Sequence, residues 1–260
     1  MAQRPVVLLG EVHDNASQHA ARAEALRRLV AGGVRPAIAF EQFDRERQAD
    51  LDRARTEPLA RGASRVDHLI EQGGGSNSWK WSLYRPYLQL ALDHELPIVA
   101  ANLSRPAAMR VAQQGYAAEL GAELRAAHRL DQLPAGFLDA HERALESTHC
   151  GLTPAAMLPA LARAQIARDL TLTEAIRPHF ERGVILLAGN GHVRNDIGVP
   201  FFLSADERAR TLSIGLLEST GSDEEATQFD VTIRTRPQPR EDPCAALRQR
   251  YSPATGSPSR

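Results

Sequence analysis

The chain has 260 residues, with 31 basic and 32 acidic side chains and a formal net charge of −1 at pH 7. This balance gives no support to a nucleic-acid-binding surface, and no apolar run approaches the ~20 residues of a membrane span. The two cysteines, Cys150 and Cys244, form no CxxC motif, which argues against a disulfide framework and a cysteine-based metal site.

Apolar runs alternate with helical patterns along the chain. The first half predicts a strand at 5–9, a helix at 18–30, a strand at 36–40, a charged helix at 44–55, a short helix at 67–70, a glycine-rich loop at 73–78 and a helix at 84–94. The second half predicts a strand at 97–101, alanine-rich helices within 107–127, helices at 136–147 and 158–176, and strands at 184–188, 211–216 and 229–235.

The predicted fold class is α/β. Runs of Val, Ile and Leu without polar alternation are typical of strands buried in a parallel sheet. We therefore expect a mostly parallel central sheet covered by helices on both faces, with a helical insertion between the third and fourth parallel strands. The last two strands are expected to be antiparallel edge strands. Residues 1–236 are expected to form a single domain, and 237–260 a disordered tail rich in Pro, Ser and Arg.

Two Gly-x-x-His strings follow predicted buried strands. Gly10-Glu11-Val12-His13 comes after the first strand, and Gly189-Asn190-Gly191-His192 comes after the fourth. Ligands bind at the carboxyl edge of open α/β sheets. If the two strands are close together, His13 and His192 converge on one pocket.

Other strand ends add polar groups to the same expected edge. Glu41 follows the second strand, Asn102 and Arg105 follow the third, and Arg194 lies beyond the fourth. Asp14 and Asn15 are well suited to capping the next helix. Glu41 follows an apolar run directly, so a buried carboxylate there needs a partner.

These side chains suit two chemistries, and the sequence leaves both open. His13, His192 and Glu41, or Glu11 in its place, could ligate a divalent metal with an open position for water, which favours hydrolysis. Alternatively, one histidine acts as a general base beside a carboxylate without metal. Glu11, His13, Glu41 and His192 are the catalytic candidates in both cases.

Two further features have competing interpretations. Trp79, Trp81, Tyr84 and Tyr87 form an aromatic cluster beside the glycine-rich loop, which suits either core packing or a ligand-facing lid. His19, on the first helix, is expected at the surface.

The chain resembles the ChaN-like haem-binding proteins. The resemblance spans Val6 to Pro200 and includes 8–15, 39–43, Trp81, 84–86, 100–102, 149–151, 164–165, 168–169, 188–194 and 198–200. It implies a parallel sheet wrapped by helices and a role in iron acquisition or haem handling. It also implies haem held through a tyrosine between the subunits of a homodimer.

The resemblance makes Tyr84 and Tyr87 the candidate haem ligands. The cofactor-binding set is completed by Asn102, Arg105 and Arg194. The wider superfamily includes erythromycin-esterase-like and Tiki/TraB-like proteins, some of them metal-dependent proteases, and their polar positions match Glu11, His13, Glu41 and His192. Haem or iron binding is therefore the favoured function, and a metal-dependent hydrolase is the alternative.

The chain departs from the family at its N-terminus. Members are often lipid-anchored, but these first residues contain no lipid-attachment cysteine and leave no room for a secretory signal. A cytoplasmic location is therefore expected, or a periplasmic or membrane-anchored one if a leader has been removed.

Overall fold

The computed structural model describes residues 4–75, 78–148, 151–219, 223–242 and 244. Its described strands form one six-stranded sheet in the order β3-β2-β4-β1-β5-β6, and every neighbouring pair is parallel. The strands are β1 (Val6–Leu9), β2 (Ala37–Asp44), β3 (Ile98–Asn102), β4 (Val184–Leu187), β5 (Thr211–Glu218) and β6 (Val231–Thr235). The predicted α/β class is confirmed.

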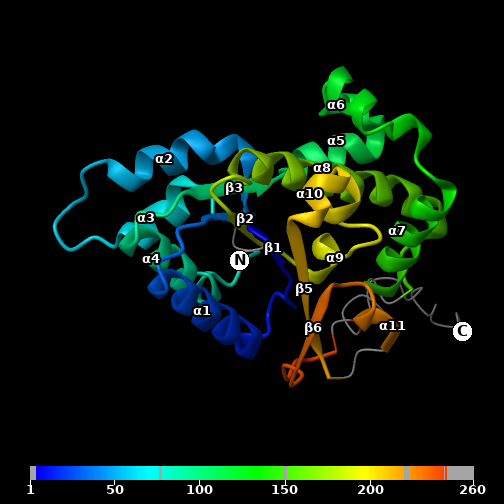
Figure 1. The fold of residues 1–260 in the computed structure, drawn as a ribbon. Helices are drawn as coiled ribbons and strands as arrows, with labels where there is room; N and C mark the ends of the chain where they lie inside the picture. Colours follow the sequence, from blue (N-terminus) through cyan, green and yellow to red (C-terminus); the bar gives the residue numbers. More distant parts are fainter. Residues whose placement is uncertain (1–3, 76–77, 149–150, 220–222, 243, 245–260) are drawn as a thin grey trace, which may run out of the picture.

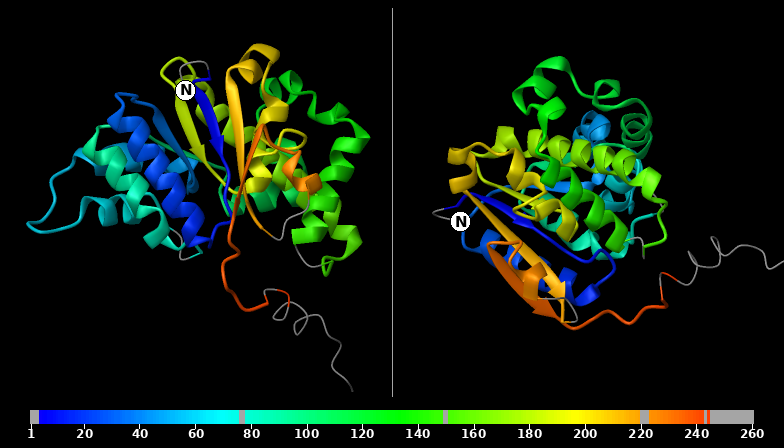
Figure 2. Two further views of the ribbon diagram at one scale, coloured as in Figure 1. Left: turned by 60° about the horizontal axis from the view of Figure 1, so that its bottom comes forward. Right: turned by 90° about the vertical axis from the view of Figure 1, so that its right-hand side faces the viewer.

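Helices cover both faces of this sheet (Figures 1 and 2). The α-helices are α1 (Ala16–Ala31), α2 (Gln48–Thr56), α3 (Arg65–Gln72), α4 (Arg85–Asp93), α5 (Arg105–Gln114), α6 (Ala122–Ala127), α7 (Ala135–Thr148), α8 (Leu158–Ile176), α9 (Asn190–Val193), α10 (Ala205–Ala209) and α11 (Asp223–Ala226). The 3-10 turns include η1 (Arg45–Arg47), η2 (Trp81–Leu83), η6 (Arg177–His179) and η7 (Val199–Phe202).

Alternation along β1 shows how the two faces are built. Val7 and Leu9 pack with residues of α1 to α4 in one core, whereas Val6 and Leu8 pack with α8 and α9 in the other. Successive side chains of a strand point to opposite faces. A strand with helices on both sides must therefore be apolar throughout, as the sequence pattern indicated.

The predicted helical insertion lies between β3 and β4. Helices α5 and α7 pack on α8 and form a third apolar cluster with Val111, Phe137 and Leu170. Because α8 also packs on the sheet, the insertion adds an outer layer to one face. Figure 1 shows it beyond α8.

The prediction of antiparallel edge strands is wrong. β5 pairs with both β1 and β6 in parallel, Ile214 lying opposite Val231. Parallel neighbours need a crossover of about a dozen residues. The connection between β5 and β6 includes α11 and is long enough, although it is shorter than the helical crossovers earlier in the chain.

The C-terminal segment is described only in part. Positions 237–242 lie along the body, where Arg240 donates hydrogen bonds to Asp14 and Glu218, and most of the predicted disordered tail lies outside the described residues. Cys244 is disulfide-bonded, which the sequence analysis did not predict. The other cysteine of the sequence, Cys150, is outside the described residues. No helix in the described part of the chain is long and apolar enough to cross a membrane.

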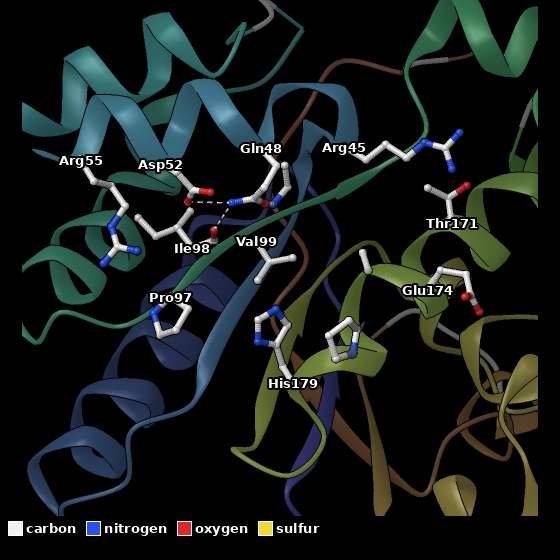
Figure 3. A pocket seen from close by; sticks show the side chains of 13 residues that line it. Arg45, Gln48, Asp52, Arg55, Pro97, Ile98, Val99, Thr171, Glu174 and His179 are labelled. Atoms are coloured by element: carbon white, nitrogen blue, oxygen red, sulfur yellow. Dashed lines mark hydrogen bonds between the residues drawn. The ribbon is translucent and has the colours of Figure 1, made fainter. Parts of the chain in front are cut away.

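The side chain of Gln48 closes the outer edge of β3. Its amide donates to the Ile98 carbonyl at 3.0 Å and accepts from the Ala100 N–H at 2.7 Å, so it replaces the backbone of a neighbouring strand. Figure 3 shows it beside a cavity of about 500 Å³ between α2, β3 and η6. An edge strand that is already paired is a poor template for association with another chain.

Gln48→Ala is expected to destabilise the fold by about 1–3 kcal/mol, because it leaves backbone groups of β3 unpaired. Chemical denaturation measures the change. Gln89→Ala is the matched control, since Gln89 donates a hydrogen bond to Asp93 in an exposed pair. Equal effects of the two substitutions would contradict the assigned role.

Candidate functional site

The two Gly-x-x-His strings meet at the carboxyl edge of the sheet. β4 lies between β1 and β2, so the residues that follow these three strands are neighbours. The Oε1 atom of Glu41 is 4.0 Å from His13 Nε2 and 3.4 Å from His192 Nε2. The predicted convergence of His13 and His192 is confirmed.

His13 is the open imidazole of this site. Its side chain is 47% exposed, and its ring meets that of Trp79 edge-on at 4.9 Å between centroids. Its Nδ1 lies 2.9 Å from Glu11 Oε1. Because a carboxylate only accepts, Nδ1 donates to Glu11, and Nε2 is the nitrogen on the side of Glu41.

Glu11 is held by a buried network that the sequence analysis did not predict. Its carboxylate pairs with the guanidinium of Arg22 and accepts a hydrogen bond from the hydroxyl of Tyr84. His19 Nε2 lies 3.4 Å from Glu11 Oε2. Glu11 and Arg22 are 2% and 1% exposed. A buried charge pair of this kind fixes the Glu11 carboxylate, and through it the orientation of His13.

His192 lies between two carboxylates. Its Nδ1 is 2.6 Å from Asp169 Oδ1, and its Nε2 faces Glu41. Burial opposes its charged form, but Glu41 and Asp169 outweigh burial and raise the pKa of His192 to about 10. Burial likewise opposes ionisation of Glu41, yet the positive charge of His192 lowers the pKa of Glu41 to about 2. The site therefore places the imidazolium of His192 and the open imidazole of His13 beside the same carboxylate, that of Glu41.

Glycine at position 189 leaves room for the ring of His13. Its N–H donates to Glu41 Oε2 at 2.7 Å. A Cβ there would lie 2.8 Å from His13 Cε1 and 2.9 Å from His13 Nε2, closer than such contacts allow. The glycine of the second string thus makes room for the histidine of the first.

A cavity of about 500 Å³ opens on these groups, which is within the range of small-molecule sites. It is lined by Glu11, Val12, His13, Glu41, His141, Ala144, Leu145, Gln165, Arg168, Gly189, Asn190, Gly191, His192 and Ile197. His141 comes from α7 and was not predicted. Nothing in a helical sequence pattern indicates which neighbouring strand end a side chain will meet.

The tyrosines predicted as haem ligands are buried and less accessible to a ligand. Tyr84 and Tyr87 are fully buried; the Tyr84 hydroxyl donates to Glu11 and that of Tyr87 to the His19 carbonyl. In this conformation neither hydroxyl is open to an iron atom. His19 is 3% exposed, so the expectation of a surface histidine is wrong, because Arg22 and Tyr87 enclose the same face of α1.

Two of the cofactor-binding candidates from the third and fourth strand ends, Asn102 and Arg194, are engaged with protein groups. Asn102 is buried and accepts a hydrogen bond from Arg168 at 2.9 Å. Arg105 is exposed at the start of α5 and does not line the cavity. Arg194 forms two hydrogen bonds with Asp196. Arg168, which lines the cavity, is the better placed cation.

The divalent-metal set of His13, Glu41 and His192 remains a prediction. Over the ranges that the structure describes, no group of three or more His, Cys, Asp or Glu side chains is arranged to hold a metal ion. A metal ligand must be a deprotonated imidazole. His192 has each ring nitrogen beside a carboxylate and carries a proton that a metal would have to displace.

The raised pKa of His192 predicts a specific pH dependence. The folded protein keeps a proton that the unfolded chain releases above about pH 6.5, so the stabilisation is complete below pH 6.5 and is lost as the pH rises towards 10. We expect the free energy of unfolding to fall across this window, by less than about 1.4 kcal/mol per pH unit. Nitrogen-15 NMR of the ring checks the assignment, and deprotonation of His192 near pH 6.5 would contradict it.

The chain is similar to a known protein family and to solved structures. A family model described as haem-binding uptake, Tiki superfamily, ChaN, matches residues 1–203. No curated protein sequence matches the chain.

The chain is similar to two solved structures. ChaN of Campylobacter jejuni, described with cofacial haem binding, is 20% identical, with 88% of this chain and 87% of that chain covered and a TM-score of 0.68. A mutant erythromycin esterase in its open conformation is 16% identical, with 83% and 70% covered and a TM-score of 0.47. At these identities the likeness concerns the fold alone.

Proposed function

Because the chain belongs to the ChaN family of haem-binding uptake proteins in the Tiki superfamily, we propose that it binds haem in the cavity at the carboxyl edge of its sheet. The observation that carries the proposal is His13. It is a half-exposed imidazole that lines the cavity, and Glu11 holds its Nδ1, which leaves Nε2 as the ring nitrogen for a ligand. Imidazole is a common axial ligand of haem iron.

The rest of the cavity suits a flat, largely apolar ligand with acidic side groups. Val12, Ala144, Leu145 and Ile197 contribute apolar wall, and the guanidinium of Arg168 supplies a positive charge for a carboxylate. The tyrosine expected from the family resemblance is not offered by Tyr84 or Tyr87 as they lie here. We therefore assign the iron contact to histidine. A role in haem handling or iron acquisition follows as part of the same proposal.

Titration with haem tests the proposal. We expect a saturable shift of the Soret band at one haem per chain, because a single cavity holds the ligand. Metal-free protoporphyrin is the control, since it fills the same volume without an iron to ligate, and it should bind more weakly. A non-saturating response to haem, or equal affinity for both compounds, would contradict iron ligation by the protein.

One observation favours a second candidate, a hydrolase. In the cavity, the open imidazole of His13 and the imidazolium of His192 both lie beside the carboxylate of Glu41. His13 Nε2 would accept a proton from an attacking water, and the positive charge of His192 would stabilise the developing oxyanion. Turnover of small esters that is lost in His13→Ala and unaffected by His68→Ala would support it. No turnover across an ester and peptide panel would leave haem binding as the function.

A further inference from the structure

We propose that residues 235–242, the C-terminal strap, position the turn that carries His13, and that the disulfide at Cys244 makes this hold sensitive to thiol reductants. The strap begins at the last residue of β6 and continues past the carboxyl edge of the sheet (Figure 2). It lies beyond residue 203, where the match to the family model ends. The proposal goes beyond the proposed function, and only its haem readout rests on that function.

His13 lies in a tight turn between β1 and α1, the His13 turn (residues 12–15). The Asn15 N–H donates to the Val12 carbonyl at 2.9 Å, which closes the turn. The Val12 N–H donates to Gln18 Oε1 at 2.7 Å, which ties the turn to α1. Val12 and His13 both line the cavity. Contacts that fix this turn therefore fix part of the cavity wall.

The first residues of the strap contact the two side chains that shape the His13 turn. Asn15 caps α1 and donates through Nδ2 to the Arg236 carbonyl at 3.0 Å. Gln18 donates through Nε2 to Thr235 Oγ1 at 2.9 Å. Asn15 and Gln18 are fully buried, and a buried polar group that loses its partner is costly. The start of the strap and the turn are thus joined by buried hydrogen bonds.

Arg240 fixes the outer part of the strap. Its guanidinium donates two hydrogen bonds to Asp14, at 2.7 and 2.9 Å, and two to Glu218, also at 2.7 and 2.9 Å. Asp14 follows His13 in the turn, and Glu218 is the last residue of β5. The hydrogen bonds from Arg240 lower the pKa of Glu218 to about 2. Because a bidentate arginine fixes the direction of a carboxylate as well as its distance, Arg240 ties the His13 turn to the sheet.

A disulfide fixes the far end of the strap. Cys244 lies two residues beyond it and is disulfide-bonded, whereas the near end continues from β6. The Arg240 contact with Asp14 is a weak hold on its own, since the two side chains are 31% and 49% exposed and water competes for such pairs. A dithiol reductant gives two electrons and two protons to the disulfide, which yields two thiols and the oxidised dithiol. The strap then keeps one fixed end, so we expect it to leave the turn more often.

Hydrogen exchange of the full-length protein tests the strap without haem. In Arg240→Gln, the amides of Val12 and Asn15 should exchange about fivefold faster than in the wild type, because the turn opens more often. The amides of β1 should keep their rates; a loss of global stability would instead accelerate them as well. Arg53→Gln is the matched control, because Arg53 also pairs with two carboxylates and does not line the cavity.

Two further substitutions test the contact between Arg240 and Asp14. Asp14→Asn should accelerate exchange of the same two amides, and the double substitution should add little to either single one, because both remove one interaction. Arg240→Lys keeps the positive charge and should restore part of the protection. Fully additive effects would show that Arg240 does not act on the turn through Asp14, and would contradict the strap.

Reduction tests the role of the disulfide. Dithiothreitol should accelerate exchange of the Val12 and Asn15 amides in the wild type, and Cys244→Ser should show this acceleration without reductant. The chain has two cysteines, so reduction breaks no second disulfide within it. Unchanged exchange of these amides on reduction, or in Arg240→Gln, would overturn the proposal.

Haem release gives a second readout, and this one rests on the proposed function. Haem should dissociate about fivefold faster from Arg240→Gln and Cys244→Ser than from the wild type or Arg53→Gln, because an open turn takes His13 away from the cavity wall. Equal dissociation rates in all four proteins would show that the strap does not position His13, and would overturn the proposal. Failure of the wild type to bind haem would remove the proposed function, and the exchange rates would still decide the strap.

Discussion

Glu11→Gln is expected to lower the free energy of unfolding by about 3–5 kcal/mol, the usual cost of removing one partner of a buried ion pair. Glu11 is 2% exposed and Arg22 is 1% exposed, so the guanidinium of Arg22 would lose its carboxylate without gaining water. The glutamine amide is neutral, so it cannot balance the charge of Arg22 as well as accept hydrogen bonds from Tyr84 and His13. Chemical denaturation at constant pH measures the loss.

Two comparisons separate this effect from loss of a hydrogen bond alone. The double substitution Glu11→Leu with Arg22→Met removes both charges, and we expect it to recover much of the stability lost in Glu11→Gln. Glu24→Gln breaks an exposed pair with Arg27 and Arg28, which should cost less than about 1 kcal/mol. A Glu11→Gln variant as stable as Glu24→Gln would show that the buried pair does not stabilise the fold.

The strands could be predicted because their apolar composition is visible in a short stretch of sequence. A strand covered on both faces is apolar at every position, so 6–9, 37–40 and 184–187 are recognisable from composition. Strand direction is not local. β6 has an exposed pattern with Val231 and Ile233 facing solvent, which resembles an antiparallel edge strand. Only the path of the connection through α11 makes it parallel.

The part of the site that directly follows the strands could be predicted from the sequence. His13, Glu41 and His192 follow buried strands, and parallel topology brings such positions to one edge. The surrounding residues Arg22, Asp169 and His141 come from helices, and their contacts depend on how each helix is rotated in the fold. The buried aspartate that holds His192 lies in the apolar α8, where a single acidic residue has no periodic signal.

The second large effect is expected at Gly189, where the second Gly-x-x-His string packs against His13 of the first. Gly189→Ala would place a Cβ within 3 Å of two ring atoms of His13. The Gly189 backbone, at φ −62° and ψ 152°, suits any residue, so the effect comes from the lack of space alone. Because His13 is half exposed, its ring can swing outward, and the overpacking cost should stay below about 3 kcal/mol.

Displacement of His13 removes the ligand that Glu11 had positioned, so haem should bind on the order of 100-fold more weakly to Gly189→Ala. Gly191→Ala is the matched control, since it lies in the same turn and its Cβ would meet nothing within 4 Å. Haem titration and denaturation of both variants make the measurement, and nitrogen-15 NMR of His13 reports the ring movement without haem. If Gly189→Ala and Gly191→Ala bind haem equally well, the iron does not depend on the position of His13, and the haem site must lie elsewhere in the chain.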